Sequence, residues 1–292
     1  MIFDRLNEMK ISREVNEKYN FLKPIEFCNL VRFGKVYDGG YIVPEKIIKE
    51  SDGLISFGYG YDPSFEYDYI KNTGNKVHIY DYTCNSYYLI KLFLKYIKRF
   101  LLFRKKLKDV IFHYKNLKDH INFFRHKKIN YQKKKIVTKK LVNSKTFVST
   151  YSAGEIPLIK SEITIDQIFS KIDFKKIIFK CDIEGSEYLI MDDLLKYHDR
   201  IDVMIFEFHW VDKNLKDFTE CVTKILKYFS IVHIHGNNHN QFVEGVNIPI
   251  VPEITFVNNK FIKERIDIKK FPIDKLDSPN NHFVEDLFFH FK

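Results

Sequence analysis

Apolar runs that stop at acidic or polar residues recur along this chain, and stretches with helical periodicity separate them. A short run of β-branched and aromatic residues bounded by turn residues predicts a buried strand. Because such strands alternate with helices throughout, the pattern predicts an α/β fold with a mostly parallel sheet and helices on both faces. We expect the strands at 54–57, 76–81, 177–181, 200–210, 231–235 and 252–257.

Two segments near the N-terminus are predicted from turn chemistry and periodicity. Residues 30–44 hold two short β-like runs around an Asp-Gly-Gly turn signal, which predicts a hairpin. Residues 1–29 are expected to form an N-terminal helical cover, with a polar, weakly amphipathic helix over 3–20. Later in the chain, 131–142 predicts a lysine-rich strand and 163–169 a short helix capped by its Thr.

A basic helical insertion is expected over 86–131, after the second strand. Apolar residues recur there at helical spacing, interleaved with Lys and Arg. Such a helix can lie on an anionic membrane, bind an acidic partner, or pack on the domain or a second subunit. Packing is the default interpretation, because two adjacent helices can bury each other's apolar stripes. Peripheral membrane contact through 88–107 and a homodimer both stay open.

At 292 residues the chain is long enough for one large domain or two small ones, and without repeats or a linker that would clearly divide it we expect a single domain over 1–292. Hydrophobic residues make up 45% of the chain, which supports a real core and argues against disorder. The net charge is +10, but most of the excess lies between about residues 91 and 145, so charge alone does not indicate nucleic-acid binding. The four Cys are far apart, and neither a signal peptide nor a long uncharged run is present, so we expect a cytoplasmic protein without a transmembrane segment.

The segment 177–187 carries the clearest chemical signal. An apolar strand ends there in Asp182 and Glu184, a glycine gives a tight turn, and Ser186 is placed to cap a helix over 187–195. In open α/β sheets ligands bind at the carboxyl edge of the strands. These carboxylates are therefore candidates for ligand binding, although a strand–turn–helix with solvated acids would give the same pattern.

A glycine loop and a second acid add to this signal. Gly58 and Gly60 would let the backbone approach a ligand closely, and Pro63 suits the first turn of a following helix. The full GxGxxG fingerprint is absent, which disfavours a nicotinamide-dependent oxidoreductase. Asp81 ends the second strand, where a Rossmann-like fold holds the ribose hydroxyls of an adenosine cofactor. An Asp that only caps the following turn would give the same pattern.

Several motifs resemble those of class I S-adenosylmethionine-dependent methyltransferases, closest to the FkbM-type and related methyltransferase-like families. Residues 180–187 (KCDIEGSE) resemble the K-x-D-x-E-G-x-E signature of the FkbM group, and 165–169 resembles its L-D-x-L lead-in. Residues 38–41 (DGGY) and 56–66 resemble the D-G-G-Y and S-F-G…D-x-S-F-E pattern of the methyltransferase-like relatives. The insertion has no counterpart in these families, and the glycine loop departs from their usual D-x-G-x-N-x-G form.

The resemblance implies a class I methyltransferase fold that binds S-adenosylmethionine at the strand ends. Gly58 and Gly60 would approach the methionine part of this donor, Asp81 its ribose, and Asp182 the neighbourhood of its sulfonium. The other cofactor-binding residues that the resemblance implies are Asp38, Gly40, Tyr41, Phe57, Asp62 and Glu184.

Methyl transfer to a hydroxyl requires that the acceptor be aligned with the S–CH₃ bond and lose its proton. His235 and His209 are the candidate general bases, with Glu207 close to His209 in the sequence. A divalent metal held by Asp182, Glu207 and the His-x-His and Asn-Asn residues of 233–238 is a further option, because such an ion activates a bound hydroxyl.

The favoured function is an O-methyltransferase that acts on a sugar hydroxyl, in a nucleotide-linked sugar or a surface glycan. One alternative is a non-catalytic binding or scaffold protein that keeps the sheet and uses the basic helices to hold an acidic partner. Another is a nucleic-acid methyltransferase, suggested by the positive charge. The chain lacks an N-P-P-Y-type loop for flipped bases, so no nucleic-acid partner is expected.

Overall fold

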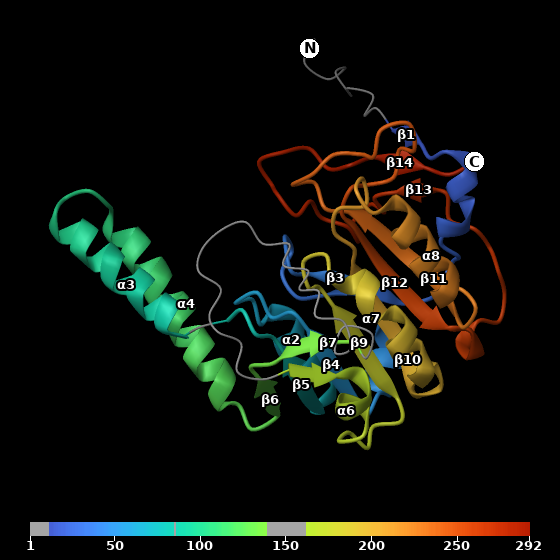
Figure 1. The fold of residues 1–292 in the computed structure, drawn as a ribbon. Coiled ribbons are helices and arrows are strands. Elements are labelled where there is room, and N and C mark those ends of the chain that lie inside the picture. The colour runs from blue at the N-terminus through green and yellow to red at the C-terminus, as the bar shows by residue number, and fades with distance from the viewer. Residues whose placement is uncertain (1–11, 85, 139–161) are drawn as a thin grey trace, which may run out of the picture.

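A mixed sheet forms the centre of the molecule (Figure 1). The computed structural model describes residues 12–84, 86–138 and 162–292. The strands of this sheet within those ranges are β4 (Gly53–Phe57), β5 (Lys76–Tyr80), β6 (Ile129–Gln132), β9 (Ile177–Cys181), β10 (Ile201–Glu207), β11 (Phe229–Gly236) and β12 (Pro252–Asn258). Their spatial order is β6–β5–β4–β9–β10–β12–β11.

The strand directions identify the fold class. Strands β6, β5, β4, β9 and β10 are parallel, whereas β12 runs antiparallel to both of its neighbours, β10 and β11. Numbered along the chain, the order is 3-2-1-4-5-7-6, which is the Rossmann order 3-2-1-4-5-6 with a reversed strand inserted before its last member. The predicted Rossmann-like fold with a mostly parallel sheet is therefore confirmed.

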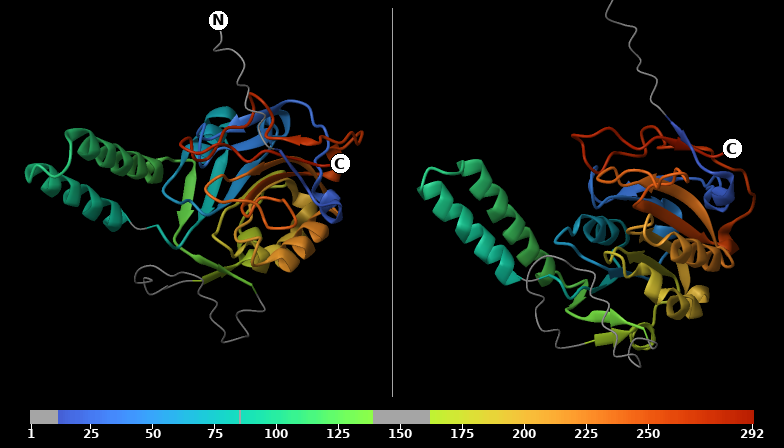
Figure 2. Two further views of the ribbon diagram at one scale, coloured as in Figure 1. Left: turned by 90° about the horizontal axis from the view of Figure 1, so that it is seen from above. Right: turned by 45° about the horizontal axis from the view of Figure 1, so that its top comes forward.

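Helices cover both faces of the sheet, as predicted (Figure 2). Because strand side chains alternate between faces, Ile55 and Phe57 enter one apolar core and Leu54 the other. The first core is shared with α6 (Ile165–Phe169), α7 (Glu187–Leu194) and α8 (Leu215–Ile225), and the second with α1 (Glu45–Lys49) and α2 (Ser64–Thr73). Short 3-10 helices follow α7 and β12, namely η2 (Leu195–Arg200) and η3 (Asn259–Phe261).

The predicted hairpin is confirmed as β2 (Leu30–Phe33) paired antiparallel with β3 (Tyr41–Pro44). The strand expected over 131–142 is wrong in extent. Its described part is divided between β6 in the main sheet and β7 (Lys135–Val137), which pairs with β8 (Glu162–Thr164), while residues 139–142 lie outside the described ranges. Thr164 caps α6 as predicted, although the residues before it are extended.

The expected N-terminal cover lies partly outside the described residues, which begin at 12. Its described part contains β1 (Arg13–Glu14) and the 3-10 helix η1 (Glu17–Leu22) in place of an α-helix. Strand β1 pairs with β14 (Phe289–His290), which also pairs with β13 (Lys270–Phe271), so both ends of the described chain meet at one side of the molecule (Figure 1).

Two long helices, α3 (Ser86–Leu101) and α4 (Leu107–Arg125), occupy the chain between β5 and β6. We call this pair the α3–α4 hairpin. It projects from the body of the molecule in every view (Figures 1 and 2). None of the helices in the described ranges combines the length and apolar character that crossing a bilayer requires.

Candidate functional site

Three predicted residues meet at the carboxyl edge of the central strands. Phe57, the last residue of β4, lies in register with the last residues of both β5 and β9. The residues that follow these strands, Gly58, Asp81 and Asp182, therefore emerge side by side. The Gly58 amide donates to the Tyr80 carbonyl (3.2 Å), and the Asp182 amide donates to the Phe57 carbonyl (2.9 Å). Asp81 and Asp182 thus flank the glycine loop on the same edge of the sheet.

A hydrogen-bonded cluster continues along this edge. The Tyr41 hydroxyl lies 3.0 Å from Glu207 Oε2 and 3.3 Å from Asp182 Oδ2, and its single proton can serve one of these carboxylates at a time. Asn237, just after β11, donates to Glu207 Oε1 at 2.9 Å. We call the carboxyl groups gathered here the acidic rim: Asp38, Asp182, Glu184, Glu207 and Glu253.

Burial and neighbouring carboxylates disfavour the ionised forms of Glu207 and Asp38 in the acidic rim. Burial, together with the charges of Asp182 and Glu253, raises the pKa of Glu207 well above its usual range. Burial likewise raises the pKa of Asp38, although a hydrogen bond from Asn280 opposes the shift. A positive charge among these groups would stabilise their ionised forms, so the rim suits a cationic ligand.

His209 faces the acidic rim, and Glu187 holds the opposite side of its ring. Its Nδ1 lies 3.0 Å from Glu187 Oε1, while its Nε2 lies 3.5 Å from Glu184 Oε2 and 3.8 Å from both Asp182 Oδ1 and Glu207 Oε1. Burial alone would lower the pKa of His209, but Glu187, then Glu207 and Asp182, raise it to about 10. The fully buried Glu187 thus fixes the ring with Nε2 directed at the rim.

Part of this cluster has the chemistry of a divalent-metal site. Ligand atoms of Asp182, Glu184 and His209 all lie within 4.8 Å of one another. A carboxylate on the far nitrogen of the imidazole, here Glu187, is the usual partner of a metal-binding histidine. One imidazole and two carboxylates suit ions such as Mn²⁺, Fe²⁺ or Zn²⁺, so these residues fit a divalent metal.

His235, the other predicted base, is held between Glu253 of the acidic rim and Asp286 of the C-terminal segment. Its Nδ1 is 3.1 Å from Glu253 Oε2, its Nε2 is 3.2 Å from Asp286 Oδ1, and the residue is only 2% exposed. Burial alone would lower the pKa of His235, but the hydrogen bonds to Asp286 and Glu253 raise it to about 10. With a carboxylate on each nitrogen, the ring has no lone pair directed at a substrate.

The Asp81 side chain is hydrogen-bonded to the backbone of the glycine loop. Its carboxylate accepts hydrogen bonds from the amides of Tyr59 (2.8 Å), Gly60 (3.3 Å) and Thr83 (2.7 Å), and from the Thr83 hydroxyl (2.6 Å). Burial would raise the pKa of Asp81, but these bonds lower it. A ribose hydroxyl could reach this carboxylate only by replacing one of these donors.

The two loop glycines have different surroundings. A Cβ on Gly58, whose φ is +81°, would lie 1.6 Å from the carbonyl oxygen of Asp182, so Gly58 allows the close approach of a neighbouring strand's backbone. A Cβ on Gly60 (φ +55°) would have no heavy atom within 4 Å. Of the two, Gly60 is the one with open space beside it.

Three predicted cofactor-binding residues have structural contacts in the fold. Phe57 is fully buried and packs edge-on against Phe179. The Gly40 carbonyl accepts from Arg32 Nη1 at 2.9 Å within the β2–β3 hairpin. Asp62 accepts from the Ser64 amide at the start of α2 (3.0 Å). Ser186 occupies the cap position of α7 but makes no side-chain capping bond.

Four residues of this site were missed by sequence reasoning. Lys180, nearly buried, donates to the Gly58 carbonyl (3.2 Å), lies 3.8 Å from Glu66 and sits over the Tyr41 ring. Its signal was present: a lysine inside an otherwise apolar strand, within the 180–187 motif. Glu187 belongs to the same motif. Glu253 and Asn280, joined by a 2.6 Å hydrogen bond, gave no signal, because only the reversed direction of β12 brings Glu253 to this edge.

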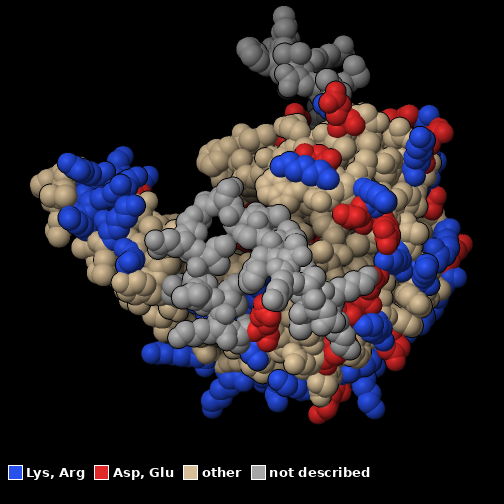
Figure 3. All heavy atoms as spheres, viewed as in Figure 1, with Lys and Arg blue, Asp and Glu red and all other residues tan. Residues whose placement is uncertain are grey.

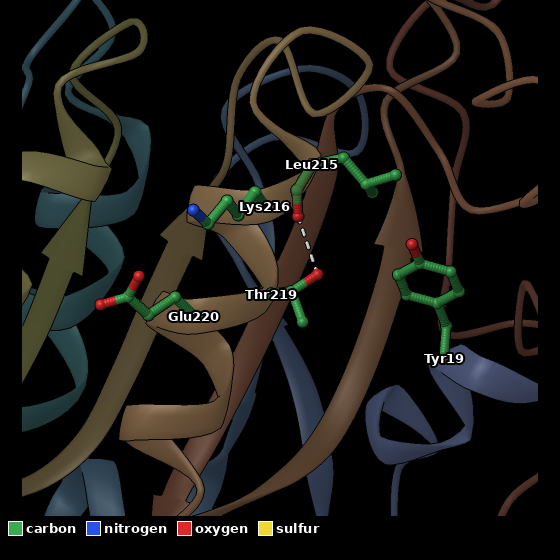
Figure 4. A pocket seen from close by; sticks show the side chains of 5 residues that line it. All are labelled: Tyr19, Leu215, Lys216, Thr219 and Glu220. Carbon is green, nitrogen blue, oxygen red and sulfur yellow. Dashed lines mark hydrogen bonds between the residues drawn. The ribbon is translucent and has the colours of Figure 1, made fainter.

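A shallow hollow lies between η1 and the first turns of α8 (Figure 4). Its lining includes none of the predicted site residues, and its one drawn hydrogen bond runs within α8, from the Thr219 hydroxyl to the Leu215 carbonyl at 2.7 Å. The lining residues are Tyr19, Leu215, Lys216, Thr219 and Glu220. This hollow is therefore separate from the acidic rim.

Comparison with known proteins gave distant structural similarity alone. No protein-family model matches the chain, and no curated protein matches it. A structure from Pyrococcus horikoshii, provisionally assigned as an RNA methyltransferase, aligns with 83% of this chain and 97% of its own, at 13% identity and a TM-score of 0.32. The 23S rRNA methyltransferase ErmE aligns with 73% of this chain and 66% of its own, at 7% identity and a TM-score of 0.30. The fold class stated above rests on the order and direction of the strands.

Proposed function

We propose that this protein is an S-adenosylmethionine-dependent methyltransferase that transfers a methyl group to a hydroxyl, with a sugar hydroxyl as the favoured acceptor. The observation that carries the proposal is the convergence of Asp182, Glu207 and His209 beside the glycine loop, at the carboxyl edge of a Rossmann-like sheet. Ligands of such sheets bind at this edge. A sulfonium nucleoside suits the acidic rim because it brings a positive charge to crowded carboxyl groups.

The donor would be held by residues on both sides of the glycine loop. Asp182 would lie near the sulfonium, Gly60 beside the methionine part, and Asp81 would meet the ribose by exchanging one of its hydrogen bonds within the loop. On transfer, the S–CH₃ bond breaks, an O–CH₃ bond forms, and the sulfur loses its positive charge. The acidic rim is therefore expected to bind S-adenosylmethionine more tightly than the product S-adenosylhomocysteine.

His209 is the proposed acceptor of the hydroxyl proton. Glu187 at Nδ1 orients the ring and leaves Nε2 facing the rim, which is the arrangement that an oriented general base requires. A cation bound nearby disfavours the protonated imidazole, so the donor itself promotes the basic form. Glu207, whose Oε1 is 3.8 Å from His209 Nε2, is the second candidate for this role.

A divalent metal is the alternative means of activating the hydroxyl. Asp182, Glu184 and His209 would hold it, and Glu187 would fix the imidazole. A metal ion supplies Lewis acidity that lowers the pKa of a bound hydroxyl. In that case His209 binds the metal and does not take the proton.

The sugar acceptor, in a nucleotide-linked sugar or a surface glycan, rests on the motif resemblance of 180–187 and 38–41. A cytoplasmic location is proposed with it. A nucleic-acid methyltransferase is the second candidate, favoured by the eleven Lys and Arg residues of the α3–α4 hairpin.

The test is incubation of the protein with S-adenosylmethionine and a panel of nucleotide-linked sugars or single-stranded RNA, with and without EDTA, followed by mass spectrometry. A gain of one methyl group on a sugar supports the favoured acceptor, and a gain on RNA alone supports the second candidate. Asp182→Asn should abolish the gain. Asp192→Asn is the matched control, because that exposed acid pairs with Lys224 on the outside of α7 and should leave activity unchanged. Methylation of neither acceptor by the wild type, or full activity of Asp182→Asn, would contradict the proposal.

A further inference from the structure

Nearly all of the protein's net charge lies in the α3–α4 hairpin. Residues 86–125 contain eleven Lys and Arg but only two Asp and no Glu, whereas the rest of the chain contains 37 basic and 36 acidic residues. Figure 3 shows Lys and Arg side chains gathered at the far end of the hairpin. The body of the molecule is close to neutral, so this projection is a localised cationic element.

The hairpin is a folded unit that extends away from the body. Its helices pack on each other through ring contacts such as Tyr96 with His113 (centroids 3.8 Å apart) and Phe93 with Tyr114 (5.8 Å). At 1.5 Å per residue, α4 alone is about 28 Å long. The turn between the helices is therefore held well away from the acidic rim (Figures 1 and 2).

The turn of the hairpin, residues 101–107, displays apolar side chains to solvent. Leu101 is 68% exposed, Phe103 98% and Leu107 55%. The residues between Phe103 and Leu107 are all cationic: Arg104, Lys105 and Lys106. A projecting turn that combines exposed apolar and basic side chains has the composition of segments that enter the headgroup region of a bilayer.

The backbone at Phe103 adds a second observation. Helix α3 ends in a Schellman motif, in which the Arg104 amide donates to the Arg99 carbonyl (2.8 Å) and the Phe103 amide to the Phe100 carbonyl (2.9 Å). Phe103 occupies the left-handed position of this motif (φ 54°), where glycine is favoured. A large apolar residue is thus displayed at a position where it stabilises neither the turn nor the core, which points to a role in binding.

We propose that residues 101–107 dock the protein onto an anionic lipid bilayer, with Leu101, Phe103 and Leu107 entering the interface and the three cations contacting lipid phosphates. Charge complementarity selects this partner over a second copy of the chain, because two such cationic turns repel each other. The exposed aliphatic residues favour lipid over nucleic acid, whose phosphates would leave them in water. The proposal is independent of the methyltransferase assignment.

The base of the α3–α4 hairpin packs directly against the glycine loop. At the base of the hairpin, the Tyr59 hydroxyl lies 3.2 Å from His120 Nδ1, and the Tyr59 ring stacks on Phe123 with centroids 4.9 Å apart. The Tyr59 amide in turn donates to Asp81. A docked hairpin would therefore hold the edge of the sheet that carries Asp81 at a fixed distance from the membrane.

The test is co-sedimentation of the full-length protein with vesicles of phosphatidylcholine alone or with about one third phosphatidylserine. We expect binding that requires the anionic lipid. Replacing Arg104, Lys105 and Lys106 together by Ser should weaken it about 100-fold, because each basic residue near an anionic surface contributes about fivefold. Phe103→Gly should weaken it by about tenfold or more while leaving the unfolding temperature unchanged or higher, since glycine suits the left-handed position.

The matched control is Phe283→Gly, which removes an equally exposed Phe (86%) from the C-terminal segment and should not affect binding. Three results would overturn the proposal. The first is equal or absent binding to both vesicle types. The second is a dimer, detected by light scattering, that Phe103→Gly dissociates. The third is tight RNA binding that the triple substitution abolishes in the absence of any vesicle binding.

Discussion

Alanine substitution of the two loop glycines should have very different effects on stability, although both residues have positive φ. At Gly60, where a Cβ would have open space, alanine meets only the backbone strain of the left-handed region, about 1–2 kcal/mol, partly offset by reduced entropy of the unfolded chain. We therefore expect Gly60→Ala to lower the free energy of unfolding by about 1 kcal/mol. This substitution measures the effect of backbone conformation alone.

Gly58→Ala adds a steric conflict that side-chain rotation cannot relieve. The new Cβ would lie 1.6 Å from a main-chain oxygen, that of Asp182, so β4 and β9 must separate at their ends. This would disturb the hydrogen bond from the Asp182 amide to the Phe57 carbonyl and that from Lys180 to the Gly58 carbonyl. With about 1 kcal/mol for each bond and about 1–3 kcal/mol for overpacking, this conflict adds about 4 kcal/mol to the loss of about 1 kcal/mol expected from the positive φ alone.

The assay is thermal and urea unfolding of both variants beside the wild type, followed by circular dichroism. A difference of about 4 kcal/mol between the variants corresponds to roughly 10 °C in unfolding temperature for a domain of this size. Equal destabilisation by the two substitutions would refute the close approach of β4 and β9 at Gly58. So would a more stable Gly58→Ala.

Three further predictions address particular contacts. Burial would raise the pKa of Asp277, but His233 lowers it to about 2, so this carboxylate stabilises the fold above about pH 4 and loses that contribution as the pH falls toward 2. Asp277→Asn should therefore lower the free energy of unfolding by about 2 kcal/mol at pH 7, measured by urea unfolding. A difference from the wild type that persists unchanged at pH 2 would contradict this. Thr164→Ala should lower the free energy of unfolding by about 1 kcal/mol because it removes the cap of α6. Ser170→Ala, at the exposed end of that helix, should lower it far less. Equal losses of stability in thermal unfolding would argue against the cap. Glu187→Gln should lower the affinity for Mn²⁺ about 10–100-fold in calorimetric titration, and unchanged affinity would argue against the metal site.

Apart from β6, the strands of the sheet could be predicted because each is a local apolar run that ends at a polar residue. The edge shared by Asp81 and Asp182 followed from the rule that parallel strands connected by helices present their carboxyl ends together. What the pattern could not supply was the reversed direction of β12, since an apolar run has the same composition in either direction. That reversal brings Glu253 to the acidic rim.

The hydrogen-bond partners of His209 and His235 could not be predicted from local sequence patterns either. His209 and His235 had equal standing in the sequence, as histidines after buried strands. The two histidines differ in their hydrogen-bond partners. Glu187 is bound to Nδ1 of His209 and leaves Nε2 facing the rim, whereas Asp286 is hydrogen-bonded to Nε2 of His235, whose Nδ1 already contacts Glu253. Asp286 lies in an irregular C-terminal segment, 51 positions from His235. No periodicity or spacing indicates such a contact.

The central claim is that the acidic rim binds a sulfonium nucleoside, and isothermal titration calorimetry with S-adenosylmethionine tests it most directly. We expect saturable binding by the wild type, weaker binding of S-adenosylhomocysteine, and a loss of about tenfold or more in affinity for S-adenosylmethionine in Asp182→Asn, as expected for a lost charge-assisted contact. If the wild type shows no binding of S-adenosylmethionine, or binds it as tightly when Asp182 is replaced, the claim is wrong.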